Sequence, residues 1–316
     1  MEYTSLGSTG VKVSRIGLGA WQFSHTWGVT DYNTAKQIID KALSLGINLI
    51  DTAMVYGRGL SEEFIGRALR ELKVSRDDVF IATKIPGDFL GYDDVFKAVD
   101  RSLKRLQVDY IDLMQVHWPP CWHNHPTCEY MKALERLVNL GKINYIGLSD
   151  FPVELVDAAR SCLSRVDVEV LQVRYNIVER QAEKELIPYA EENGMSVLAW
   201  SPLAKGAVLG KYTLEEAKKL SDVRSDDPLF YPENYEQVLG LARLVKEVAD
   251  KYGKTPAQVV LNWLIGYSDT VIPIPGAKRP EQVEDNAGAV GWRLDYSDWR
   301  LLDEESKRLR ITYVTW

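Results

Sequence analysis

Eight short apolar runs recur along this chain, and their regular alternation with longer stretches limits the folds available to it. Each run is rich in Ile, Val and Leu and is too continuous for a half-exposed strand. Such runs are typical of parallel strands buried on both faces. The runs span residues 15–18, 48–51, 79–84, 111–117, 143–149, 168–172, 196–200 and 270–274.

The stretches between these runs carry helical signals. In residues 92–106, apolar side chains recur at three- and four-residue intervals and line one face of a helix. Thr255 precedes Pro256 and is followed three residues later by Gln258, the pattern of a capping box. Ser61 is predicted to cap the helix that follows it.

Strand-like runs alternating with helices predict an α/β fold, a (β/α)₈ TIM barrel formed by residues 1–316 as one domain. Two short segments, 3–6 and 11–13, flank a Gly-Ser-Thr-Gly turn and predict a β-hairpin before the barrel. A long irregular region, 202–235, is expected at the C-terminal face of the barrel. A doubly wound nucleotide-binding fold is the alternative, but Gln22 stands where its third fingerprint glycine belongs.

Charge and composition limit the classes of partner and the cellular locations expected for the chain. The chain of 316 residues carries 38 Lys and Arg against 45 Asp and Glu, a net charge of −7, which disfavours nucleic acid and anionic membranes. No apolar run is long enough to span a bilayer, and we find no targeting signal, so a cytoplasmic location is expected. Three cysteines cannot build a disulfide framework, which favours a reducing compartment.

Polar residues end the second, third and fourth runs. Asp51, Lys84 and His117 are spaced by 33 residues each, about one strand–helix unit, so neighbouring strands would place them on one rim. Tyr56 follows Asp51 by five residues and can reach the same pocket. Active sites of such barrels lie at this face.

This set of side chains suits proton donation. A lysine beside a tyrosine favours the ionised phenol, and Asp51 would keep Lys84 charged. Lowering a phenol pKa from about 10 to about 8 takes about 2.7 kcal/mol, within the reach of a desolvated Lys. Tyr56 could then protonate a carbonyl oxygen that His117 orients. We find no nucleophile–base pair and no metal set, so a cofactor is expected to bring the nucleophile, as a hydride.

With these residues in place, the sequence resembles the aldo-keto reductase superfamily over nearly its whole length. Residues 51–62, from Asp51 through Tyr56, look like the family signature. Ile-Ala-Thr-Lys at 81–84 and Gln-Val-His-Trp at 115–118 match the lysine and histidine strands. Segments 172–176, 200–203 and 274–280 resemble the parts that hold the cofactor.

The resemblance implies roles for individual residues. Tyr56 would be the proton donor, Lys84 would lower its pKa, Asp51 would pair with Lys84, and His117 would orient the carbonyl. Trp200 stands where the family stacks an aromatic ring on the nicotinamide. The remaining cofactor contacts that the resemblance implies are Gly19, Trp21, Asp51, Ser149, Asp150, Gln172, Ser201, Pro202, Leu203, Gly206, Lys211, Gly276, Lys278, Arg279, Gln282 and Asn286.

Asp150 departs from the family pattern, which usually has Asn after the serine. An ionised Asp can only accept hydrogen bonds, whereas Asn can also donate. Asp150 could still accept from a carboxamide NH₂ while Ser149 donates to its oxygen. We therefore expect cofactor binding to persist with a changed set of partners.

The implied cofactor is NADP(H). Lys278 and Arg279 precede Pro280 at an expected helix start, where two cations and backbone N–H groups would favour a 2′-phosphate. Lys211 could cover the pyrophosphate. Trp21, Trp27, Trp118 and Trp122 suggest an apolar pocket for a small aromatic or aliphatic carbonyl substrate, or they simply pack the loops.

Other functions compete with carbonyl reduction. A regulatory or redox-sensing subunit that binds NADP(H) and turns over slowly is the main alternative, though binding alone requires no acid. A metal-dependent hydrolase would need ligands at several strand ends, and only His117 is there. Cys121, His123, His125 and Cys128 lie too close together for a typical zinc site, so no metal is expected; a Cys121–Cys128 disulfide is disfavoured. The oligomeric state stays open.

Overall fold

Eight parallel strands form a closed ring in the computed structural model, which describes residues 1–25, 28–121 and 124–313. Each strand pairs with the next one along the chain, so the order is that of the sequence. This confirms the predicted (β/α)₈ barrel. The strands are β3 (Leu18–Gly19), β4 (Leu49–Asp51), β5 (Phe80–Ile85), β6 (Ile111–Val116), β7 (Ile143–Ser149), β8 (Val168–Arg174), β9 (Ser196–Trp200) and β10 (Val271–Pro273).

Backbone hydrogen bonds between the first and last strands close the ring. Gly17 N–H donates to Pro273 O and Gly19 N–H to Pro275 O, each at 3.0 Å. A Cβ at Gly19 would lie 2.6 Å from Ile274 O, so only glycine permits this approach. The first strand begins three residues later than predicted, because Arg15 N–H still pairs with Glu2 O in the preceding hairpin.

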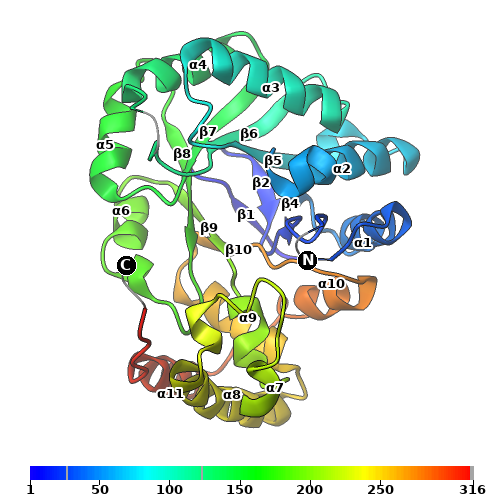
Figure 1. Ribbon diagram of the computed structural model, residues 1–316, viewed down its shortest axis with the longest axis vertical. Coiled ribbons are helices and arrows are strands. Elements are labelled where there is room, and N and C mark those ends of the chain that lie inside the picture. Colours follow the sequence, from blue (N-terminus) through cyan, green and yellow to red (C-terminus); the bar gives the residue numbers. More distant parts are fainter. Residues whose placement is uncertain (26–27, 122–123, 314–316) are drawn as a thin grey trace.

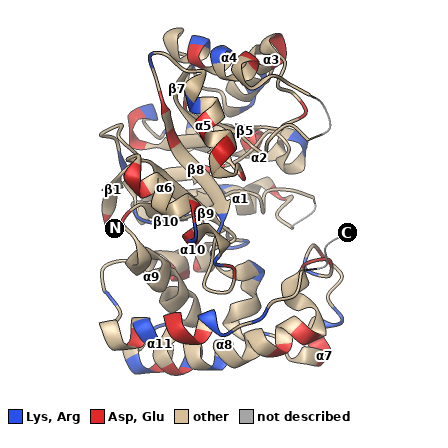
Figure 2. Ribbon diagram, turned by 90° about the vertical axis from the view of Figure 1, so that its left-hand side faces the viewer, with Lys and Arg blue, Asp and Glu red and all other residues tan. Residues whose placement is uncertain are grey.

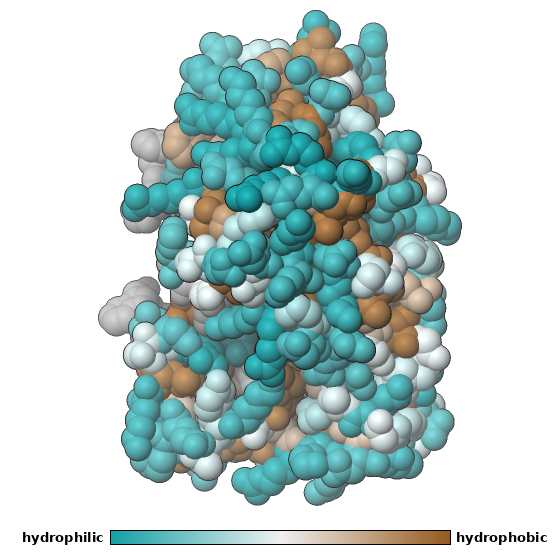
Figure 3. All heavy atoms as spheres, turned by 90° about the vertical axis from the view of Figure 1, so that its right-hand side faces the viewer, coloured by the Kyte–Doolittle hydropathy of each residue, from teal (hydrophilic) through white to brown (hydrophobic). Residues whose placement is uncertain are grey.

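Helices surround the barrel on its outside (Figure 1). Charged residues lie mostly on these helices and on loops, whereas the strands carry few (Figure 2). On the face shown in Figure 3, hydrophobic atoms form small areas between hydrophilic ones. The helices are α1 (Tyr32–Ser44), α2 (Leu60–Glu71), α3 (Tyr92–Leu106), α4 (Thr127–Asn139), α5 (Val153–Ser161), α6 (Leu186–Glu192), α7 (Leu214–Ala217), α8 (Pro232–Tyr252), α9 (Pro256–Tyr267), α10 (Pro280–Ala287) and α11 (Tyr296–Lys307).

The predicted hairpin covers the N-terminal end of the barrel. Its strands, β1 (Tyr3–Ser5) and β2 (Lys12–Ser14), are antiparallel and lie at the centre of Figure 1. Gly7 N–H donates to Ser196 Oγ at the start of β9. Leu6 and Val13 are fully buried against the apolar side chains inside the ring. The opposite end is therefore the one left open for a ligand.

The helix-start predictions have different outcomes. Thr255 caps α9 in a complete capping box with Gln258, as predicted. The prediction for Ser61 is wrong, because α2 begins two residues earlier than a Ser61 cap requires, and Gly59 occupies the cap position. The buried Ser61 hydroxyl instead donates to Ala20 O and pairs with Thr52, joining α2 to the barrel.

The long region after β9 contains short helices rather than a bare loop. A 3₁₀ turn covers Ala204–Leu209, α7 follows, and another 3₁₀ turn covers Pro228–Phe230 before α8 begins at Pro232. None of the helices in the described ranges is both long enough and apolar enough to cross a membrane.

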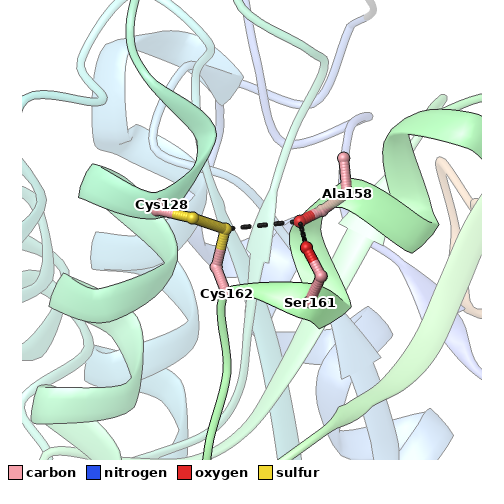
Figure 4. The surroundings of a disulfide bond; sticks show 4 residues. All are labelled: Cys128, Ala158, Ser161 and Cys162. Carbon is pink, nitrogen blue, oxygen red and sulfur yellow. Dashed lines mark hydrogen bonds between the residues drawn. A yellow bond between two sulfur atoms is a disulfide. The ribbon is translucent and has the colours of Figure 1, made fainter.

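A disulfide joins two neighbouring helices through a pair of cysteines that the sequence did not indicate. Cys128, in the first turn of α4, bonds to Cys162 at the end of α5, with a Cα–Cα distance of 5.0 Å (Figure 4). The two residues are 34 positions apart, and only the packing of α4 beside α5 brings them together. Cys121 is free and exposed.

Replacing both Cys128 and Cys162 by Ser should lower the free energy of unfolding by about 2–4 kcal/mol, because the unfolded chain loses its cross-link. Chemical denaturation of the oxidised proteins measures this. Cys121→Ser is the matched control and should leave stability within about 0.5 kcal/mol. A reductant should bring the wild type to the stability of the double variant; unchanged wild-type stability under reduction would contradict the prediction.

Candidate active site

A cavity of about 590 Å³ opens at the C-terminal end of the barrel. Its floor is formed by the ends of strands, since Asp51, Ser149 and Trp200 are the last residues of β4, β7 and β9. The long region after β9 contributes part of its wall. The polar strand ends predicted from the sequence therefore share one site.

Lys84 is the centre of a hydrogen-bonded set at this floor. Its Nζ donates to Asp51 Oδ1 at 2.5 Å and to Tyr56 OH at 3.2 Å. A third bond, 2.8 Å long, goes to Thr52 O. All three protons of the ammonium thus have acceptors, although the Lys84 side chain is 0% exposed.

Two glutamines hold the other oxygen of Asp51. Gln115 Nε2 donates to Asp51 Oδ2 at 3.1 Å and Gln172 Nε2 donates to it at 2.9 Å. Gln172 also donates to Gln115 Oε1. Gln115 was not singled out from the sequence, although its place two residues before His117 on β6 puts it on the same inward-facing side.

A tight turn after β4 presents Tyr56 to Lys84. Gly57, Arg58 and Gly59 all have positive φ in the 3₁₀ turn Tyr56–Gly59. At Gly59, φ is +100°, a backbone conformation that residues with a Cβ rarely adopt, so the turn favours glycine there. The Arg105 guanidinium pairs with the buried Glu62 of α2.

Burial and neighbouring charges shift the pKa values of Tyr56 and Lys84 in opposite directions. Burial raises the pKa of Tyr56 and outweighs Lys84, which lowers it. This differs from the sequence expectation of a net decrease. For Lys84, burial lowers the pKa, but Asp51 and then Tyr56 oppose this and leave it raised. At neutral pH the site therefore holds a protonated phenol beside an ammonium group.

His117 is neutral in this surrounding. Burial, followed by the positive charge of Lys84, lowers the pKa of His117 to about 2. Its Nδ1 atom is buried and has no hydrogen-bond partner in the described ranges. The ring meets Tyr56 edge to face, with centroids 5.6 Å apart, and Trp118 at 4.5 Å. A neutral imidazole of this kind can orient an oxygen by one hydrogen bond.

Asp150 and Trp200 form a second polar contact in the cavity. Trp200 Nε1 donates to Asp150 Oδ1 at 3.0 Å. Asp150 has φ of +57°, and its N–H donates to Gln172 O. The Arg174 guanidinium lies 5.5 Å from the Trp200 ring centroid and helps to hold the indole.

Asp227 ties the long region after β9 to the barrel. It is buried and accepts from Arg174 of β8 at 2.8 Å and from Lys205 at 2.7 Å. Arg174 also pairs with Glu179 at 2.6 Å. Sequence reasoning missed this network, since Asp227, Glu179 and Lys205 lie outside the predicted strands and helices and give no periodic signal.

Cationic side chains gather at another part of the cavity wall. Lys211, Arg224 and Lys278 all line the cavity. Burial, together with the neighbouring charge of Arg224, lowers the pKa of Lys278. Arg224 is held by Asp222 at 2.6 Å and by Tyr212 OH at 2.8 Å. Like charges that face one cavity suit an anionic ligand, and Arg224 is a candidate that the sequence did not reveal.

The structure places most predicted site residues around this one cavity. Lys84 lies directly behind it. Arg279 is exposed beside Glu281, and neither it nor the buried Asn286 is a lining residue. Trp27 and Trp122 lie outside the described residues. Those that line the cavity are Gly19, Trp21, Asp51, Tyr56, His117, Trp118, Ser149, Asp150, Gln172, Trp200, Ser201, Pro202, Leu203, Gly206, Lys211, Gly276, Lys278 and Gln282.

Other chemistries find little support at this site. Among the described lining residues, no serine is hydrogen-bonded to a histidine. Within residues 1–25, 28–121 and 124–313, no cluster of three or more His, Cys, Asp or Glu side chains could hold a metal ion. Cys128, part of the short Cys/His segment, is in a disulfide. The site thus offers an acid and a ligand cavity.

The fold is a (β/α)₈ barrel with a polar site at the C-terminal ends of its strands, and comparison with known sequences identifies its family. The family model described as the Aldo/keto reductase family matches residues 15–307. The chain belongs to the aldo/keto reductase family.

Individual relatives agree with this assignment. Aldo-keto reductase YhdN of Bacillus subtilis (strain 168) is 38% identical over 309 residues, covering 94% of this chain and 91% of that protein. The glycerol dehydrogenase AKR11B4 from Gluconobacter oxydans superposes with a TM-score of 0.86 at 31% identity, covering 99% and 97% of the two chains. An aldo/keto reductase from Klebsiella pneumoniae, solved with NADP and acetate, gives 0.76 at 28% identity, covering 100% of both.

The low pKa of His117 predicts how stability depends on pH. Unfolded, a histidine titrates near 6.5, so unfolding takes up a proton below that pH and stability falls as the pH decreases. His117 should contribute a slope of up to about 1.4 kcal/mol per pH unit below pH 6.5. His117→Gln should therefore show a shallower loss of unfolding free energy between pH 6.5 and 4.5, measured by chemical denaturation. Parallel profiles for the two proteins would contradict a neutral buried His117.

Proposed function

We propose that this protein reduces an aldehyde or ketone to an alcohol, with Tyr56 as the proton donor and NADPH as the cofactor. The observation that carries the proposal is the Tyr56–Lys84–Asp51 set, with 3.2 Å and 2.5 Å between successive polar atoms at the floor of a cavity. The set supplies an acid but no nucleophile. NADPH, when bound, supplies the hydride.

The residues at the floor of the cavity each have a separate role in the proposed proton transfer. Tyr56 holds its proton at neutral pH, because burial raises its pKa, and gives it to the oxygen as negative charge develops there. Lys84 stabilises the phenolate that remains, and Asp51 keeps Lys84 charged. Neutral His117 holds the carbonyl oxygen next to Tyr56 without competing as an acid.

The cavity residues fit the proposed cofactor. Ser149 and Gln172 offer hydrogen-bonding groups for a carboxamide, and Trp200 offers an aromatic face. Lys211, Arg224 and Lys278 offer cations for phosphates. The Klebsiella reductase that was solved with NADP has the same fold over its full length, which supports NADP(H) here.

The substrate class follows from the open end of the cavity. Trp21, Val55 and Trp118 line it together with His117 and Tyr56. Apolar and aromatic walls around one polar point suit a small aliphatic or aromatic carbonyl. A regulatory NADP(H)-binding subunit with slow turnover is the second candidate, which the cations that line the cavity also suit. The cytoplasmic location stays a prediction.

Replacing Tyr56 by Phe should lower the rate of NADPH oxidation with aldehydes by at least about 100-fold, since general acids contribute roughly 10²–10⁴-fold. NADPH affinity should change little, because the phenol oxygen acts on the substrate. Spectrophotometric turnover with a panel of aromatic and aliphatic aldehydes measures the rate. Tight NADPH binding without wild-type turnover of any carbonyl would favour the regulatory candidate.

Removing the cations that we propose to face the phosphates should weaken NADPH binding more than NADH binding. Arg224→Leu and Lys278→Met should each weaken NADPH binding about 10- to 100-fold, the loss of one charge-assisted contact, and weaken NADH binding much less. Calorimetric titration measures both affinities. Arg279→Leu is the matched control, because Arg279 is exposed outside the cavity lining. Equal losses for NADPH and NADH would contradict recognition of the 2′-phosphate by these residues.

A further inference from the structure

One carboxylate at the reactive end of the cavity has no counter-ion. The buried cations nearby are each matched, Lys84 by Asp51, and Arg174 and Lys205 by Glu179 and Asp227. No Lys or Arg within the described ranges comes within ion-pair distance of Asp150. Asp150 therefore adds one net negative charge to this end of the site.

The carboxylate of Asp150 is held in the cavity by several contacts. Trp200 Nε1 donates to its Oδ1 at 3.0 Å, and its own N–H is bound to Gln172 O at 2.9 Å. Burial raises the pKa of Asp150 above its ordinary value. The Trp200 indole, the charge of Lys84, and the backbone N–H and charge of Arg174 oppose this increase. The carboxylate is accessible to the cavity, where Ser149, Tyr56 and Gln172 also lie.

Such a charge would distinguish two redox forms of the proposed cofactor. An oxidised nicotinamide ring carries a positive charge, whereas a reduced ring is neutral. The two forms are otherwise nearly identical, and their phosphates are the same. A carboxylate near the ring thus acts on one form only.

We propose that Asp150 is a specificity-determining residue that makes this site favour the oxidised, positively charged nicotinamide over the reduced one. The inference rests on the proposed function, because it needs a nicotinamide beside Tyr56. In the proposed reaction Tyr56 gives its proton to the carbonyl oxygen, and the hydride that bound NADPH would supply to the carbonyl carbon would leave the cofactor positively charged. Asp150 therefore stabilises the charge that develops as the hydride leaves.

Calorimetric titration of the full chain with NADP⁺ and with NADPH tests the proposal without turnover. In Asp150→Asn, the preference for NADP⁺, expressed as Kd(NADPH)/Kd(NADP⁺), should fall about tenfold relative to the wild type. Asn keeps an oxygen for the Trp200 N–H and tolerates the left-handed backbone at φ +57°, so the fold should be retained.

A control separates charge from structure. Asp222→Asn removes a carboxylate beside Arg224, where both redox forms have identical phosphates, and should leave the ratio within about twofold. A positioning role for Asp150 without a charge effect would change both affinities by the same factor.

The outcomes are distinguishable. A lower ratio in Asp150→Asn alone supports the proposal. Binding of both cofactors with an unchanged ratio overturns it and leaves the proposed reductase intact. Failure of the wild type to bind either cofactor overturns both.

Discussion

The buried ion pair between Lys84 and Asp51 is the interaction on which the site depends. Removing two charges from water costs several kcal/mol per ion, and attraction offsets this only when every polar atom finds a partner. Here the ammonium has three acceptors, and the carboxylate accepts from Lys84 and two glutamines. The donors and acceptors come from β4, β5, β6 and β8, so the pair requires these strands in register.

This requirement links the chemistry of the site to the closure of the barrel. Gly19 allows the first strand to meet the last, and the hairpin fills the other end with Leu6 and Val13. A closed ring with an apolar interior excludes water below Lys84, which strengthens its interaction with Tyr56. The tyrosine then keeps its proton because of burial, while the lysine beside it stabilises the form that follows proton loss.

Charged side chains around the open end of the barrel form three separate groups. Arg174 and Lys205 meet at Asp227, so the long region after β9 is attached to the barrel by buried ion pairs. Lys211, Arg224 and Lys278 face the cavity elsewhere. Asp150 stands apart from both groups, bound to an indole rather than to a cation. The cavity thus presents positive charge along one part and, at the reactive end, the carboxylate of Asp150 in addition to the Asp51–Lys84 ion pair.

The barrel, the polar ends of its strands and the residues that meet there could be predicted from the amino-acid pattern alone. Parallel strands buried on both faces need continuous apolar runs, and a constant repeat of 33 residues places Asp51, Lys84 and His117 on one rim. Only the tertiary structure decided the pairing of Cys128 with Cys162, the role of Arg224 and the direction of the Tyr56 pKa. These depend on packing between segments distant in the sequence and on how completely water is excluded, and neither leaves a local pattern.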